Sequence, residues 1–203
     1  MPIYKELLGK DFHRLHPKLQ ERYALTIGEP FHGVGTMEKI EKGAAWLTPL
    51  LKAATRWHFL FPENGEGIPF DIKNTSRLLP TGEVEIYWER TFYFEKVTRH
   101  FNAFMTIDVK RKMVKDYVGE PRLFYSDLRF KVTPEGYMHI RSGSQRLVMG
   151  KFEILLPRLL EGVVTVEERY DDARDVFTIQ VDIQNKLAGR LMAYKGEFKE
   201  QSV

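Results

Sequence analysis

One arginine lies among large apolar residues in a segment of alternating sequence. Over residues 84–94 every second residue is apolar except Arg90, so in a β-strand its side chain points with those of Trp88 and Phe92. Burying a guanidinium is costly unless a carboxylate or backbone oxygens meet it. The segment therefore predicts an enclosed polar feature. The other face of this strand is expected to face solvent: Glu83, Glu85, Tyr87, Glu89, Thr91 and Tyr93.

A second alternating segment, over residues 164–170, offers a carboxylate. Glu168 shares a face with Tyr170 and two valines. One interpretation is a ligand-anchoring Arg90 held in place by Glu168, with Trp88 and Tyr170 as walls, because arginine binds carboxylates and phosphates bidentately. The other is a buried ion pair that fixes strand register, or an arginine that reaches out of a barrel mouth. The second is favoured, because the sequence does not say which strands are neighbours.

Nucleophilic chemistry has little support. There is no cysteine, and no serine stands in a Gly-x-Ser-x-Gly turn. Ser126 does fall on an apolar strand face, where its hydroxyl could form a hydrogen bond in a pocket. We predict no catalytic residue, and a non-enzymatic protein is favoured over an enzyme.

The sequence predicts no metal site and no cofactor. His13 and His16 are three residues apart, but Pro17 pushes His16 out of the helical region and no third ligand is near. The Gly-Val-Gly at residues 33–35 lacks the third glycine and the helix of a dinucleotide fingerprint. The basic cluster at residues 110–115 is typical of a solvated hairpin tip.

The first sixty residues are expected to be rich in helix. Gly9 is placed to end a short helix, and His16 with Pro17 to begin a second one. The two glycines at positions 33 and 35 predict a strand with a bulge or a close backbone approach over residues 31–40. A longer helix over residues 44–58 should bury a stripe of Trp46, Leu47, Leu50, Leu51 and Ala54.

The rest of the chain alternates in the manner of antiparallel strands joined by turns. About nine strands on short connections would leave exposed edges as a flat sheet, so strong curvature or closure is expected. The predicted fold is α+β, a strongly curved or barrel-like antiparallel sheet with N-terminal helices packed on it or plugging it. It forms a single domain over residues 1–203, helix-rich in 1–60 and sheet in 61–203. The predicted strands are 68–78, 83–94, 99–109, 113–118, 123–132, 137–148, 163–170, 176–184 and 189–198.

Composition argues against several classes of partner. A net charge of +3 from 31 basic and 28 acidic residues is too balanced for a general nucleic-acid binder or a membrane-surface protein. No segment has the length of a membrane span or the apolar region of a signal peptide. We expect a soluble cytoplasmic protein, with no nucleic-acid partner and an oligomeric state that the sequence leaves open.

Short motifs along nearly the whole chain resemble an uncharacterised bacterial domain family. They are His16-Pro17 with Gln20, Gly33-Val34-Gly35 with Met37, Ile68-Pro69, residues 88–92, Gly119, Pro157 and residues 189–196. This domain of unknown function occurs alone or fused behind a saccharopine-dehydrogenase-like NAD(P)-binding domain. The resemblance implies no activity, although the fusion hints at a role beside small-molecule or lipid redox chemistry.

The first functional hypothesis is non-enzymatic binding of an apolar, anionic, lipid-like small molecule inside the curved sheet. Its expected site residues are Arg90, Glu168, Trp88, Tyr170, Phe92 and Ser126. One alternative is an accessory or catalytic domain that acts with a redox partner, and another is a structural or interaction module with a solid core. A cavity with Arg90 facing into it would favour binding, and a packed interior with an apolar outer patch would favour the module.

Overall fold

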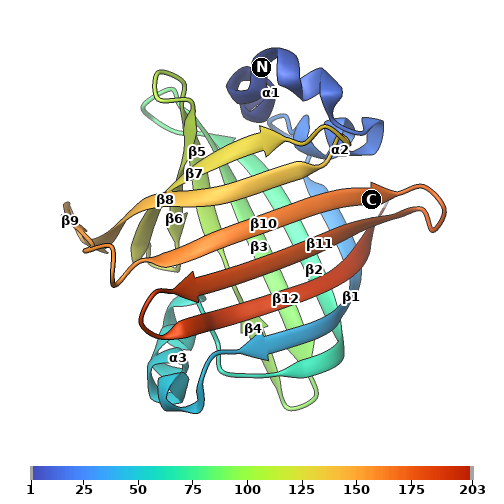
Figure 1. Ribbon diagram of the computed structural model, residues 1–203. Helices are drawn as coiled ribbons and strands as arrows, with labels where there is room; N and C mark the ends of the chain where they lie inside the picture. Colours follow the sequence, from blue (N-terminus) through green and yellow to red (C-terminus); the bar gives the residue numbers. More distant parts are fainter. Residues whose placement is uncertain (1, 202–203) are drawn as a thin grey trace.

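The alternating segments form antiparallel strands that close on themselves (Figure 1). The computed structural model describes residues 2–201. Ten strands run around a barrel in the order β10-β11-β12-β1-β2-β3-β5-β6-β7-β8, and β8 pairs with β10 to close it. Two short strands lie outside the ring, β4 against β3 and β9 against β8. The α+β class and the barrel are confirmed. The strands are β1 Phe31–Lys42, β2 Gly65–Leu78, β3 Val84–Phe94, β4 Val97–His100, β5 Ala103–Asp108, β6 Met113–Val118, β7 Phe124–Val132, β8 Met138–Met149, β9 Phe152–Leu155, β10 Gly162–Asp171, β11 Val176–Asn185 and β12 Gly189–Glu200.

Two differences from the predicted strands have a local cause. The segment predicted as one strand over 99–109 is divided into β4 and β5, because Asn102 turns its side-chain oxygen to the backbone N–H of Arg90. The strand β9 was not predicted, since all four of its residues are exposed and lack alternation in burial. The strand predicted over residues 31–40, within the helix-rich part, is β1, and it lies between β12 and β2 in the barrel wall.

The N-terminal segment covers one mouth of the barrel (Figure 1). It consists of α1 Ile3–Leu8, a 3-10 helix Gly9–Arg14 and α2 Pro17–Tyr23, and His16 caps α2 through its side chain as expected. Tyr4 is fully buried and accepts a hydrogen bond from the indole of Trp88, 2.9 Å away. The predicted plug is therefore confirmed. No helix within residues 2–201 is both long enough and apolar enough to cross a membrane.

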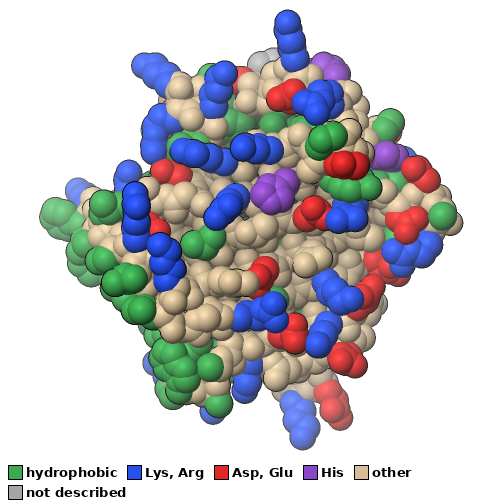
Figure 2. All heavy atoms as spheres, in the orientation of Figure 1, with side chains coloured by type: hydrophobic (Ala, Val, Ile, Leu, Met, Phe, Trp, Pro, Cys, Tyr) green, Lys and Arg blue, Asp and Glu red, His purple; other side chains and the backbone are tan. Residues whose placement is uncertain are grey.

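The other mouth carries the segment predicted as a long helix over 44–58. It is broken into a 3-10 turn Ala45–Leu47, the helix α3 Thr48–Ala54 and a second 3-10 turn Thr55–Trp57. Trp46 and Leu50 are 68% and 65% exposed, so the predicted buried stripe is only half correct. Leu47, Leu51 and Ala54 are buried, and the change from a 3-10 turn to an α-helix at Thr48 breaks the single helical period that the prediction assumed. Figure 2 shows apolar side chains gathered at this end, over β9 and over α3.

One residue on the outer face of β3 is not exposed as predicted. Glu85 is only 1% exposed, because Arg77 and Arg122 close over its carboxylate from outside the barrel. The alternation placed Glu85 on the correct face but could not show that two arginines cover it.

Candidate ligand-binding cavity

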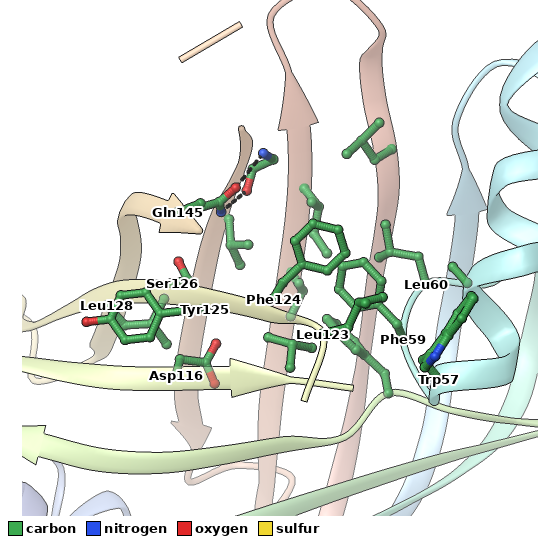
Figure 3. A pocket seen from close by; sticks show the side chains of 18 of the residues that line it. Trp57, Phe59, Leu60, Asp116, Leu123, Phe124, Tyr125, Ser126, Leu128 and Gln145 are labelled. Atoms are coloured by element: carbon green, nitrogen blue, oxygen red, sulfur yellow. Dashed lines mark hydrogen bonds between the residues drawn. The ribbon is translucent and has the colours of Figure 1, made fainter. Parts of the chain in front are cut away.

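A cavity of about 300 Å³ lies inside the barrel and extends to the mouth that carries α3. Its wall is mainly apolar. In Figure 3, Trp57, Phe59 and Leu60 lie at one end of the cavity, and Asp116 and Ser126 lie at the other. A volume of this size is at the lower end of the range for small-molecule sites.

Arg90 points into the interior, as the alternation of β3 predicted, and is 8% exposed. Its Nε donates to the backbone oxygen of Phe101 at 2.7 Å, and its Nη1 donates to the hydroxyl of Tyr194 at 3.4 Å. The guanidinium also lies 4.1 Å from the centre of the Phe101 ring. Within residues 2–201 no carboxylate forms an ion pair with Arg90. Backbone and hydroxyl oxygens thus hold this cation without neutralising it.

The predicted pairing of Arg90 with Glu168 is wrong. Glu168 is completely buried, and its two carboxylate oxygens accept hydrogen bonds from Nε and Nη2 of Arg22 at 2.9 and 3.2 Å. The remaining Nη1 of Arg22 donates to the side-chain oxygen of Asn74 at 2.9 Å. The plug explains why Glu168 pairs with Arg22 and not with Arg90, because α2 inserts Arg22 into the barrel in front of Glu168.

Arg22 was missed, although the sequence contains a signal for it. It lies three residues after Leu19 and just before Tyr23, so all three share one face of α2. Leu19 and Tyr23 are buried, and Arg22 is 2% exposed between them. The reasoning applied to Arg90 on a strand, with a helical period, would have found this second inward arginine.

Asp116 is a second residue that the sequence reasoning missed. It alternates with the buried Val114 and Val118 on β6, lines the cavity and is 7% exposed. Its Oδ1 has no hydrogen-bond partner in the described chain. Burial raises the pKa of this carboxyl to about 7, against the opposing effect of the nearby Arg90 charge.

The interior charges do not balance when Asp116 is protonated. Arg22 and Glu168 neutralise one another in a bidentate pair, which leaves the Arg90 cation uncompensated. A buried unpaired cation is unfavourable unless an anion reaches it. The apolar wall and this single positive charge together suit an apolar molecule with an acidic group.

Ser126 lines the cavity, and its neighbours across the strands are also polar. It lies opposite Asp116 on β6 and opposite Gln145 on β8. A bulge follows Ser142 in β8, so Gly143 and Ser144 of that strand lie opposite the single residue Asp127 of β7. The amide of Gln145 is bound to the backbone of Gly162, with both hydrogen bonds at 2.7 Å (Figure 3).

Two of the expected site residues lie elsewhere. Phe92 is completely buried and packs against Phe61 and Phe70 in the filled part of the core, so the cavity wall does not include it. Tyr170 lies near the end of β10 at the plugged mouth, where its ring stacks on His16 and its hydroxyl bonds Asp175. Trp88 does line the cavity, together with Arg90, Glu168 and Ser126.

Comparisons with known proteins agree with the extent of this fold. A family model described as a domain of unknown function, DUF4166, matches residues 15–198. The chain is also similar to the uncharacterised protein YndH of Bacillus subtilis (strain 168). The two are 40% identical over 191 residues, which cover 94% of this chain and 93% of the relative.

Proposed function

Because the chain belongs to the DUF4166 family, whose description names no activity, we propose from the cavity itself that the protein binds an apolar small molecule with an acidic head group. The head group lies at Arg90, and the apolar part lies along the aromatic and aliphatic wall. The observation that carries this proposal is a buried arginine that faces an apolar cavity without a carboxylate partner.

The geometry around Arg90 supports an anion of limited size. Nε of Arg90 donates to the backbone oxygen of Phe101, and Nη1 donates to the hydroxyl of Tyr194. Nη2 is therefore the guanidinium nitrogen that makes no hydrogen bond within the described chain. A carboxylate placed there gains a charge-assisted hydrogen bond in surroundings with little water. Ser126 and protonated Asp116 add hydroxyl groups that can donate to a second oxygen of the ligand.

The cavity wall supports the apolar part of the ligand. Trp57, Phe59 and Leu60 enclose one end, and Phe124 and Leu123 lie between that end and the polar residues (Figure 3). Each buried methylene of a ligand contributes about 0.8 kcal/mol. An aliphatic or aromatic carboxylic acid therefore fits better than a sugar or a nucleotide.

The test compares a fluorescent fatty acid, cis-parinaric acid, with its uncharged methyl ester. Energy transfer from Trp88 and Trp57, which both line the cavity, reports binding. We expect the acid to bind wild-type protein, and Arg90→Met to weaken its binding roughly ten- to a hundredfold, because one charge-assisted hydrogen bond is lost. Binding of the ester should change little.

Arg129→Met is the matched control, since Arg129 is an exposed arginine on β7 without an ion pair in the described chain. It should leave both affinities unchanged. Failure of wild-type protein to bind either probe, or equal loss of acid and ester in Arg90→Met, would reject the proposal.

A further inference from the structure

The open mouth of the barrel is ringed by exposed apolar side chains. Most of the large exposed apolar residues in the described chain lie there rather than at the plugged mouth. They come from three segments, which are α3 with its preceding turn, the β9 hairpin with the chain leading to β10, and the β11–β12 turn. We call them the apolar rim: Trp46, Leu50, Met149, Phe152, Ile154, Leu155, Leu159, Leu160 and Leu187.

The three segments lie close together in space. The side-chain amide of Asn185 donates to the backbone oxygens of Leu159 and Glu161 at 2.8 and 2.9 Å, which ties the β11–β12 turn to the segment before β10. The backbone N–H of Gly43, just before the α3 region, donates to the oxygen of Leu191 at 2.9 Å. Figure 2 shows the two largest apolar groups of the rim on the same side of the molecule, over β9 and α3.

The rim is continuous with the cavity. Leu50 and Leu160 are 65% and 60% exposed, and both also line the cavity. The exposed apolar surface of the rim is therefore joined to the apolar wall of the cavity through these two leucines.

Unpaired cations accompany the rim. The exposed residues Lys52, Lys151, Arg158 and Lys186 lie in the same three segments and Arg56 lies in the turn directly after α3, and none of the five forms an ion pair within residues 2–201. These segments hold two acidic residues: Glu153 is bound by Arg146 and Tyr117, and Glu161 forms no ion pair within the described residues, so five cations face one free carboxylate. Apolar side chains interspersed with free positive charges are complementary to an anionic lipid surface.

We propose that the apolar rim docks on the surface of an anionic lipid bilayer, with Trp46 and Phe152 inserted at the level of the head groups. Transfer of a ligand between bilayer and cavity rests on the proposed function, whereas docking does not. A second copy of the chain fits the rim less well, because a two-fold interface would bring the five unpaired cations against their own equivalents.

The test is flotation of the full chain with vesicles. We expect binding to phosphatidylcholine vesicles that contain phosphatidylglycerol, little binding to phosphatidylcholine alone, and a decrease as salt is raised. The double variant Trp46→Ser/Phe152→Ser should bind the anionic vesicles at least about tenfold more weakly, since two large apolar side chains are lost. Leu78→Ser/Val109→Ser removes exposed apolar side chains at the plugged mouth and should bind as wild type does.

Two further measurements separate this proposal from the proposed function. Arg90→Met should still float with anionic vesicles, and the rim double variant should still bind cis-parinaric acid in solution, which also shows that it is folded. Equal flotation of the two double variants, or no preference for anionic vesicles, would overturn docking. So would dimerisation in sedimentation experiments that the rim substitutions abolish while wild type does not float.

Discussion

At the scale of single residues, the interior is defined by two arginines in different situations. Arg22 is neutralised by Glu168 through two hydrogen bonds, and it donates a third hydrogen bond to the side-chain oxygen of Asn74. Arg90 has only uncharged oxygens within bonding distance. The first is a structural link between the plug and the barrel wall, while the second faces the cavity without an ion pair in the described chain.

Asp116 predicts an unusual dependence of stability on pH. Its pKa is raised from 3.8 to about 7 in the folded protein, so the fold favours the protonated form. Stability is therefore fully present below pH 3.8 with respect to this group, falls as the pH rises to about 7, and then levels off. Asp116→Asn should remove this fall and stabilise the protein at neutral pH by up to about 4 kcal/mol. Urea unfolding at several pH values measures the difference.

Glu95→Gln, at an exposed glutamate with no ion pair or side-chain hydrogen bond in the described chain, controls for the loss of one negative charge. The same ionisation bears on ligand binding, because a negative Asp116 competes with an anion at Arg90. Binding of cis-parinaric acid should weaken as the pH rises through 7 in wild type but not in Asp116→Asn. A wild-type unfolding profile that Asp116→Asn leaves unaltered would contradict the assignment.

At the scale of elements, the strand β1 shows why the two glycines were informative. The register of β1 against β12 shifts between Met37 and Lys39, and Gly35 lies directly opposite Phe198. A Cβ atom at Gly35 would lie 1.9 Å from the backbone oxygen of Glu197. The predicted bulge and the close approach are both confirmed.

Gly35→Ala should therefore destabilise the barrel by about 2–3 kcal/mol, because the main chain of β12 would have to move. Gly162→Ala on β10 is the control, since its Cβ would meet no backbone atom within 4 Å, only the flexible end of Leu191 at 3.2 Å and a methyl group of Ile183 at 3.5 Å. Thermal unfolding of both variants measures the effect. Equal melting temperatures would show that the two strands are less closely apposed than described.

Elements at the open mouth were the least predictable. The spacing of apolar residues over 44–58 is helical, but it does not say how much of the helix meets the barrel, and Trp46 and Leu50 are left outside. The strand β9 has no inner face at all. Periodicity identifies residues that face a core, and both segments face solvent or a partner instead.

At the scale of the whole molecule, closure of the barrel depends on a short ladder. The strand β10 pairs with β8 only over Thr165–Glu168, whereas it pairs with β11 along its whole length. Hydrogen exchange tests this closure directly. In the closed barrel the amides of 165–168 should be protected about as well as those of β11, and those of β9, which pairs on one side only, should exchange faster. Rapid exchange of alternate amides in 165–168 would instead indicate an open sheet.

The distribution of charge is also visible only in the whole molecule. A net charge of +3 made a membrane-surface role look unfavourable, because it averages over all residues. The fold gathers five cations that form no ion pair within residues 2–201 at the mouth that also carries the exposed apolar side chains. Local charge, not the total, determines which surface can meet an anionic bilayer.

The sequence by itself determined the antiparallel strands, their curvature, the cap at His16 and the inward direction of Arg90, because each follows from a local period or a local backbone preference. The tertiary structure decided which charged side chains inside the barrel pair with one another. Glu168 pairs with Arg22 because α2, a helix distant in sequence, plugs the barrel in front of Glu168. Which residues border a cavity, and which of its charges remain unpaired, depend on closure between strands far apart in the chain, and no local pattern encodes that order.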